Sequence, residues 1–307
     1  MRNAMKLLLF GGGGWSVVTT PAQSLGPELT ADGEMEIWLS PTNLTNWTEV
    51  IAGTSTVNQE TVVVHGGSNA ARLNVDGSNS LALISQALAC STGDFIEATV
   101  WAKASAGTPL ARMDLESVPI AITLSTTYTR YRTLNRAPAN NSAQVFFRSQ
   151  ANTILYFDDA SDKKLTPNTQ LVAPSANMRL AGSYALPGSP DPGTQVWLLP
   201  RISAFATGNY LLGHLVYTGS QWNAMLYTVA AHVRTATAAA ATNIGATVGM
   251  RVNCNGDTLT LETTADGITW TARGTPVTSA LYNTATGYNV IATSDVTLGA
   301  LTAQASV

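Results

Sequence analysis

The sequence predicts an all-β protein with two antiparallel β-sandwich (jelly-roll) domains behind an extended N-terminal arm. Short runs rich in Val, Ile, Thr and aromatic residues recur between clusters of Gly, Asn, Asp and Pro, which is the pattern of strands separated by turns. Helix signals are nearly absent: in the Ala/Thr-rich stretch 235–241 alanine favours a helix and threonine opposes it, so a loop fits equally well. No repeat of fixed period appears, which argues against a solenoid.

Two domains are expected because the 307 residues exceed the ~100–150 of a common domain. Every lysine precedes residue 165, so the composition changes there. Pro167 follows at once, and a proline cannot occupy a central position in a sheet. The predicted boundaries are therefore an arm at 1–26, a first sandwich at 27–166 and a second at 167–307.

Individual strands are predicted from alternation and from turn chemistry. Within 95–103, the set Phe95, Glu97, Thr99, Trp101 and Lys103 alternates with Ile96, Ala98, Val100 and Ala102, and the second set makes an apolar core face. Residues 61–64 and 71–75 are also predicted strands that end at glycine turns. The segments 250–254 and 257–263 flank Asn255-Gly256, the pair favoured in a type I′ hairpin turn.

The composition excludes some partners. Charged residues are only 11% of the chain, the formal net charge is −3 and the pI is near 5.6. The surface is thus neutral and rich in hydroxyl groups, without the basic footprint that nucleic acid requires. No apolar run approaches the ~18 residues of a membrane span.

The N-terminus has two interpretations. An apolar run follows Arg2 and Lys6 and precedes four glycines, as in a secretory signal, but it is shorter than the usual ~7–15 residues. The alternative, which we favour, is an extended arm with a glycine joint, whose apolar tip docks on a neighbouring subunit. The predicted anchor residues are Leu7, Leu8, Leu9 and Phe10.

No constellation for catalysis is recognisable. Cys90 and Cys254 lie in different halves and are predicted to be free, buried thiols. The histidines are too scattered for a metalloprotease site: His65 is interpreted as a turn residue and His214 as a hydrogen-bonded strand residue. No motif or spacing distinguishes a carboxylate pair such as Glu97 and Glu116 from two acids that occur in the sequence by chance. The chain is predicted not to be an enzyme, with no catalytic residues.

Four short motifs follow one another in an order that resembles a known family. They are Gly33-Glu34-Met35-Glu36, Asn46-Trp47-Thr48, the run 68–73 and Tyr156-Phe157-Asp158-Asp159-Ala160. In this order they resemble the jelly-roll carbohydrate-binding modules attached to xylanases and related glycanases, over residues 27–165. Residues 168–307 are similar to concanavalin-type, lectin-like sandwiches.

The first resemblance implies a structural calcium ion, which would join Glu36 to Asp159 or Asp158. Carboxylate oxygens suit this hard cation. The alternative is that Asp158 and Asp159 end the strand and accept hydrogen bonds from backbone amides in the turn. A glycosidase pair is not expected there, because consecutive strand residues point to opposite faces.

Sugar binding is a further expectation, because aromatic rings cover the apolar faces of sugars while amide and hydroxyl groups satisfy their hydroxyls. The candidates, which lie near polar or turn residues, are Trp38, Trp47, Tyr217 and Trp222. The other strand tryptophans are expected to be packing residues: Trp101, Trp197 and Trp270.

The plan of an arm followed by two neutral sandwiches resembles decoration, neck and fibre proteins of tailed bacteriophages. The leading hypothesis is a non-enzymatic structural protein at the virion surface, a homo-oligomer that contacts other virion proteins through the arm and cell-surface glycans through its sandwiches. The alternative is a secreted carbohydrate-binding protein or a fragment of an extracellular glycanase. A hydrolase comes third.

Overall fold

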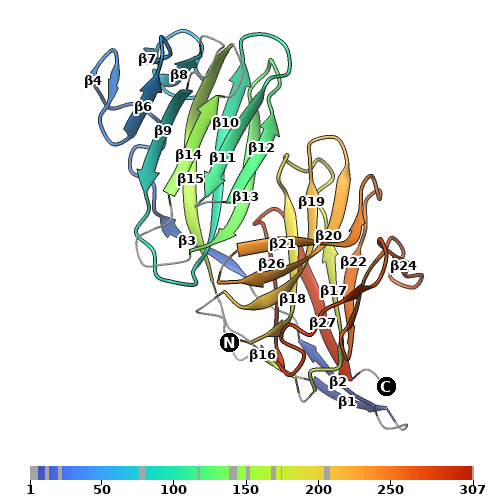
Figure 1. The fold of residues 1–307 in the computed structure, drawn as a ribbon. Helices are drawn as coiled ribbons and strands as arrows, with labels where there is room; N and C mark the ends of the chain where they lie inside the picture. The colour runs from blue at the N-terminus through green and yellow to red at the C-terminus, as the bar shows by residue number, and fades with distance from the viewer. Residues whose placement is uncertain are drawn as a thin grey trace. The chain divides into compact units, whose positions relative to one another are not determined.

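The computed structural model describes the backbone of a large part of the chain, namely residues 6–10, 14–19, 23–75, 81–115, 118–137, 144–149, 153–166, 171–173, 175–203, 208–231 and 233–305. These residues form antiparallel strands and no α-helix (Figure 1), so the predicted all-β class is confirmed. Accordingly, the described residues contain no helix of the length and hydropathy that a membrane crossing requires.

The chain divides into two compact groups. Residues 25–165 and 191–193 form one, here called the N-terminal sandwich, and residues 1–24, 166–190 and 194–307 form the other, the C-terminal sandwich. The described residues 6–10 and 14–19 thus group with the C-terminal sandwich, whereas the sequence predicted a separate arm at 1–26.

The N-terminal sandwich has two main sheets and the small hairpin β4 (Trp38–Ser40) with β5 (Asn43–Leu44). Sheet I has the order β13 (Thr129–Arg136), β10 (Phe95–Ala104), β15 (Ile154–Thr166), β8 (Ala70–Asn74) and β7 (Thr56–Glu60), with β3 (Ser24–Glu28) also beside β15. Sheet II has the order β12 (Val118–Thr123), β11 (Leu110–Leu115), β14 (Gln144–Ser149), β9 (Leu81–Ala87) and β6 (Thr48–Ala52).

The core of the N-terminal sandwich follows the alternation seen in the sequence. On β10 the predicted core face is confirmed, since four fully buried side chains belong to the core cluster: Ile96, Ala98, Val100 and Ala102. Successive strand residues point to opposite faces, so Trp101 and Lys103 lie on the outward face of sheet I. Residues 61–64, predicted as a strand, instead form a bend after β7, which ends at Glu60.

The C-terminal sandwich also has two sheets. Sheet III has the order β1 (Lys6–Phe10), β2 (Gly14–Thr19), β27 (Thr297–Ala305), β17 (Met178–Ala185), β22 (Gly249–Asn255), β23 (Thr258–Thr264) and β24 (Thr271–Ala272), and β25 (Val277–Thr278) also pairs with β23. Sheet IV has the order β16 (Leu171–Val172), β26 (Gly287–Ala292), β18 (Gln195–Ile202), β19 (Tyr210–Tyr217), β20 (Trp222–Ala230) and β21 (Val233–Ala241).

Two local predictions in this sandwich need correction. The β22–β23 hairpin forms as predicted, but Asn255 pairs with Thr258 and the turn residues are Gly256 and Asp257. Only Gly256 has a positive φ, 54°, as a type II′ turn requires, whereas type I′ would need two such residues. The Ala/Thr-rich stretch is strand β21, because pairing with β20 satisfies its backbone groups.

The N-terminal residues form a hairpin, β1–β2, at the edge of sheet III. Within it Phe10 pairs with Gly14, and β2 then pairs with β27, Val17 facing Ala303. The side chains of the predicted anchor, Leu7 to Phe10, lie outside the described residues, so their docking role stays a prediction.

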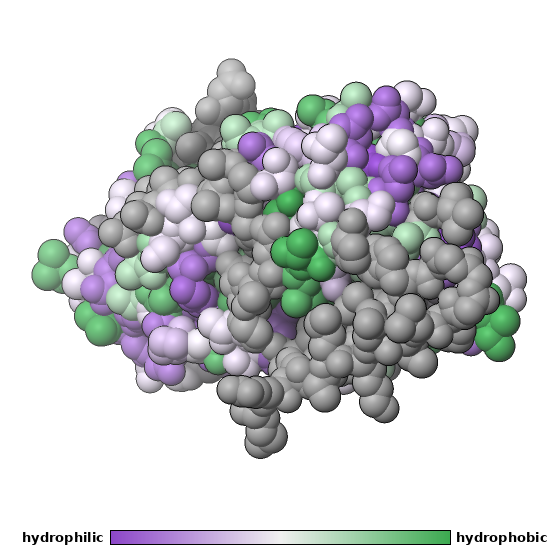
Figure 2. Space-filling view, turned by 90° about the horizontal axis from the view of Figure 1, so that it is seen from below, coloured by the Kyte–Doolittle hydropathy of each residue, from purple (hydrophilic) through white to green (hydrophobic). Residues whose placement is uncertain are grey.

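Figure 2 shows patches of hydrophobic residues lying among patches of hydrophilic residues on the coloured part of this surface. This mixed surface agrees with the low content of charged residues, 11% of the chain.

Candidate functional site

The outward face of sheet I carries aromatic and basic residues side by side. Trp101 of β10 is opposite Asp158 of β15 and Arg130 of β13, while Lys103 is opposite Tyr156. Arg72 of β8 is in turn opposite Tyr156. The residues that we call the aromatic face are His65, Trp101, Lys103, Tyr128 and Tyr156.

The rings of the aromatic face are in direct contact. The imidazole of His65 is stacked on Trp101, with 3.9 Å between ring centroids and 14° between planes. Tyr128 meets His65 edge-on at 5.4 Å, and its hydroxyl donates a 2.9 Å hydrogen bond to the carbonyl of Val63. Trp101 and Tyr128 are half-buried and His65 is exposed, so the stack is anchored in the sheet and reaches the surface.

Cationic groups border these rings. The Lys103 ammonium lies 5.7 Å from the centre of the Tyr128 ring and 5.9 Å from that of Tyr156, within the range of a cation–π interaction. Arg72 is half-buried, and its Nε is buried without a hydrogen-bond partner among the described residues. Burial raises the pKa of Tyr128, and the nearby Asp158 carboxylate adds to this, so the phenol stays neutral.

The loop 65–69 is fixed by Asp158 and Asp159. Asp158 Oδ2 accepts hydrogen bonds from the backbone amides of His65, at 2.7 Å, and Gly66, at 3.2 Å. Asp159 Oδ2 lies 2.5 Å from His65 Nδ1, so this carboxylate orients the imidazole that stacks on Trp101. Burial of Asp158 raises its pKa to about 6.

A bulge in β15 explains how two consecutive carboxylates reach one loop. Asp159 has a φ of 47°, and the register with β10 shifts between Thr99 and Trp101. The prediction that the two side chains point to opposite faces is wrong here, because the bulge redirects one of them. The predicted end of the strand is also wrong, since β15 continues through the bulge to Thr166.

Glu36 holds the other end of the same loop. Its Oε1 accepts hydrogen bonds from the backbone amides of Ser68, at 2.7 Å, and Asn69, at 3.1 Å. Its Oε2 accepts one from Asn69 Nδ2 at 2.8 Å. The predicted proximity of Glu36 to Asp158 and Asp159 therefore arises through loop 65–69, which all three contact.

Calcium does not fit these carboxylates as they are arranged. Each accepts N–H donors, whose positive ends point to where a cation would have to sit, while calcium needs about six to eight oxygen ligands. The described residues contain no group of three or more His, Cys, Asp or Glu side chains disposed to hold a metal. The calcium ion implied by the family resemblance gains no support from this geometry.

Replacing Gly67 by alanine is expected to lower the free energy of unfolding by about 2–4 kcal/mol. Gly67 has a φ of 56°, and a Cβ there would lie 1.9 Å from Glu36 Oε1, so Glu36 would have to release the loop. Gly107→Ala is the matched control, because Gly107 has a φ of 67° with nothing near its Cβ position and should cost only about 1 kcal/mol. Equal costs in chemical denaturation would contradict the role of Glu36.

The sequence-predicted sugar-binding residues do not gather at one place. Trp47 and Trp222 are each only 6% exposed and belong to the two cores, so the prediction that they contact a ligand is corrected by their burial. Trp38 and Tyr217 are half-buried and pack against those cores. By contrast Trp101, expected to be a packing residue, is on the aromatic face.

Other candidate residues have structural roles. Cys90 and Cys254 are free and buried, as predicted. His214 is buried, with its Nε2 3.0 Å from Gln195 Oε1, and burial lowers its pKa to about 3. Glu97 is buried and forms an ion pair with Arg132, while the side chain of Glu116 lies outside the described residues.

Several solved structures are similar to the chain at low identity. The tailspike protein 4 enzymatically active domain of bacteriophage CBA120 is 20% identical over 45% of this chain and 21% of its own, with a TM-score of 0.37. The CBM22-1 xylan-binding domain of Xyn10C from Paenibacillus barcinonensis is 10% identical over 47% of this chain and 96% of its own, with a TM-score of 0.31. The CBM22-1-CBM22-2 tandem from the same protein is 10% identical over 90% and 98%, with a TM-score of 0.34.

All three TM-scores are below 0.5, so these likenesses carry no argument about this chain, which spans about a fifth of the tailspike domain. No family model and no curated protein sequence matches the chain. What the molecule binds has to be argued from its own side chains.

Proposed function

We propose that the chain is a non-enzymatic, glycan-binding protein of a virion surface or another extracellular assembly, and that the aromatic face of the N-terminal sandwich is its binding site. The observation that supports this is the stack of His65 on Trp101, flanked by Tyr128 and Lys103 on an outward sheet face. Half-buried rings in fixed positions provide apolar area at little cost in side-chain entropy.

The chemistry of this face matches that of a sugar. The rings can cover the C–H face of a pyranose, while Lys103 and the Arg72 guanidinium supply hydrogen-bond donors for hydroxyl and ring oxygens, and His65 Nε2 can accept a hydrogen bond from a sugar hydroxyl. Because Asp159 and Asp158 hold the loop that carries His65, the site is formed before the ligand arrives.

A non-catalytic role agrees with the carboxylates beside the rings. Asp158 is fully buried and its oxygens accept hydrogen bonds from the backbone amides of His65, Gly66 and Asp159. Such a group positions a loop, whereas a retaining glycosidase needs two carboxyl groups facing a sugar ~5–5.5 Å apart.

Trp101→Ala is expected to weaken binding of the best ligand on a glycan array by about tenfold or more, since a buried aromatic contact is worth about 1.5–3 kcal/mol. Trp101→Phe should retain most of the affinity. Tyr217→Ala, a half-buried ring in the C-terminal sandwich, serves as the control and should leave it unchanged. Affinities measured by calorimetry, together with melting curves that show each variant is folded, check the result.

The proposal fails if no glycan binds the wild-type protein above background, or if Trp101→Ala binds as tightly as the wild type. The virion placement is tested separately, by looking for the protein in purified particles and sequencing its N-terminus.

A further inference from the structure

A second surface with the features of a binding site lies on sheet III of the C-terminal sandwich. A pocket of about 400 Å³ opens on the outward side of β17, β22, β23 and β27. Its described lining residues supply one cation, with amide and hydroxyl groups around it: Arg179, Asn253, Asn255, Thr258, Thr260, Gln304 and Ala305. None of these seven carries a carboxylate, so the pocket is neutral to positive.

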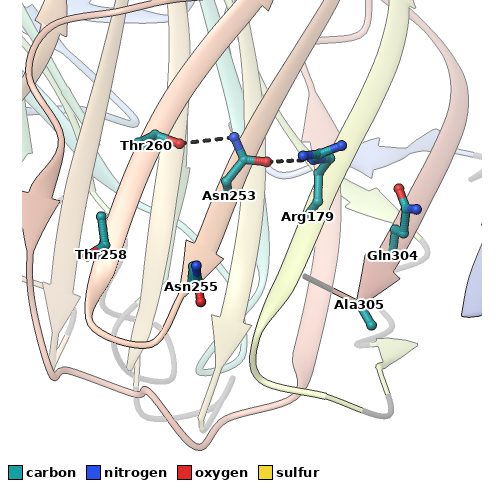
Figure 3. A pocket seen from close by; sticks show the side chains of 7 residues that line it. All are labelled: Arg179, Asn253, Asn255, Thr258, Thr260, Gln304 and Ala305. Carbon is teal, nitrogen blue, oxygen red and sulfur yellow. Dashed lines mark hydrogen bonds between the residues drawn. The ribbon is translucent and has the colours of Figure 1, made fainter. Parts of the chain in front are cut away.

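Arg179 is held in position by its neighbours. Figure 3 shows Asn253 between Arg179 and Thr260: Arg179 Nε donates to Asn253 Oδ1 at 2.8 Å, and Asn253 Nδ2 donates to Thr260 Oγ1 at 3.0 Å. Asn253 Nδ2 also donates a hydrogen bond of 2.5 Å to Glu262 Oε2. The amide is thereby oriented with its oxygen toward the guanidinium, which fixes Arg179 without occupying its terminal nitrogens.

Glu262 is hydrogen-bonded to a different arginine, Arg251, and the charge of Arg179 makes only a smaller contribution to lowering its pKa. Arg251 Nε and Nη2 donate to the two oxygens of Glu262 at 2.5 and 3.1 Å. This fork, whose hydrogen bonds keep the pKa of Glu262 below its ordinary value, pairs one acid with one base. Among the described residues Arg179 makes no ion pair, so its positive charge remains available.

An aromatic residue extends the surface along the same strands. A second hollow of about 190 Å³ is lined by Trp270, Ser183, Thr302 and Gly249 among others. The Arg251 guanidinium lies 4.4 Å from the centre of the Trp270 ring, and a Cβ at Gly249 would lie 3.3 Å from that ring. The two hollows are close neighbours along β17, because Arg179 lines the first and Ala181, two residues and about 7 Å further on, lines the second.

We propose that this face of sheet III binds an acidic oligosaccharide, with Arg179 taking the carboxylate of a uronic or sialic acid unit. The Arg179 guanidinium would hold the carboxylate through two parallel hydrogen bonds from its terminal nitrogens. Thr260, Asn255 and Gln304 would satisfy sugar hydroxyls, and Trp270 would contact a neighbouring sugar ring. The pocket is larger than a simple anion needs, and its lining of amides and hydroxyls suits a sugar.

This inference stands on a different sandwich from the aromatic face and holds whether or not that face binds a glycan. The ligand class also differs, since the aromatic face selects by ring stacking and Arg179 selects by charge. Trp101→Ala should therefore leave binding at the Arg179 pocket unchanged, and this separates a failure of one site from a failure of the other.

The test is calorimetry of the full-length chain with trigalacturonate and with sialyllactose, each compared with its methyl ester, which keeps the sugar and removes the charge. At least one acid should bind, about tenfold to a hundredfold more tightly than its ester, and the difference should shrink as salt is added. Arg179→Gln should abolish the preference for the acid. Arg273→Gln, the same change in charge outside both hollows, is the control and should keep it.

Three results would overturn the inference. They are binding of neither acid, binding of an ester as tight as that of its acid, and an Arg179→Gln variant with the affinity of the wild type. A fourth result, displacement of the bound acid by sodium acetate at equal concentration, would reduce the pocket to a general anion site and also refute the proposal.

Discussion

Replacing Arg132 by methionine is expected to lower the free energy of unfolding of the N-terminal sandwich by about 3–5 kcal/mol. Arg132 lies on β13, opposite Thr99, and Glu97 lies on the neighbouring β10; their side chains are only 1% and 2% exposed, and they form an ion pair. Methionine fills a similar volume but removes the charge that compensates the buried Glu97 carboxylate. Removing one partner of a buried pair costs far more than the pair contributes when intact, because the remaining charge cannot be hydrated.

Arg130→Met is the matched control for this prediction. Arg130 lies two residues away on the same strand and, like Arg132, forms an ion pair with Asp191, but its side chain is 41% exposed. Water solvates Arg130, so its loss should cost no more than about 1 kcal/mol. Denaturant unfolding followed by tryptophan fluorescence measures both variants, and a similar cost for the two would show that burial of the Glu97 pair is not decisive.

The stability of the N-terminal sandwich should fall as the pH rises from about 4 to about 7, largely through Asp162. In the C-terminal sandwich His214, whose pKa burial lowers to about 3, acts in the opposite direction. The side chain of Asp162 is fully buried beside the Thr30 hydroxyl, which donates a hydrogen bond to Oδ2. Burial raises the pKa of Asp162 from 3.8 to about 7 in the folded chain. The folded state therefore binds this proton more tightly than the unfolded state. The stabilisation is complete below about pH 4 and is lost as the pH rises through about 7.

The loss attributable to Asp162 amounts to up to about 4 kcal/mol, from the separation of the two pKa values. Asp158, whose pKa burial raises to about 6, contributes in the same direction. Asp162→Asn should flatten the dependence between pH 4 and 7. The control is Asp266→Asn, an exposed acid whose pKa is lowered by hydrogen bonds from the backbone amides of Ile268 and Thr269, which should leave the slope unchanged.

Unfolding free energies at four or five values of pH would check this prediction. An Asp162→Asn variant whose unfolding free energy has the same dependence on pH as that of the wild type would show that the carboxyl group is not protonated in the folded state as we expect.

Part of the candidate site was already present in the sequence pattern. Because side chains alternate along a strand, the core positions Ile96 and Val100 on β10 place Trp101 on the opposite face. The same alternation predicts that Arg251 and Asn253 face outward on β22, between the buried Met250, Val252 and Cys254. Trp101 was predicted to be a packing residue because tryptophan is usually buried. The alternation along the strand, however, already indicated that position 101 lies on the face opposite the core.

The rest of the site depends on contacts between distant segments. Local sequence cannot show that β15 bulges at Asp159, because the bulge is defined by the register with β10. Nor can it show that Glu36 reaches the amides of Ser68 and Asn69, 32 and 33 residues away. The family resemblance predicted that Glu36, Asp158 and Asp159 meet at a calcium ion, but in the structure they bind backbone and side-chain N–H groups of the loop 65–69.

By itself the sequence determined the all-β class, the antiparallel hairpin of β22 and β23 and the free, buried cysteines, because periodicity, turn chemistry and composition are local properties. Only the tertiary structure decided that β2 pairs with β27, that Trp47 and Trp222 are buried, and that His65 stacks on Trp101. These are pairings across long sequence separations, and their free energy comes from surfaces that exist only once the sheets have formed.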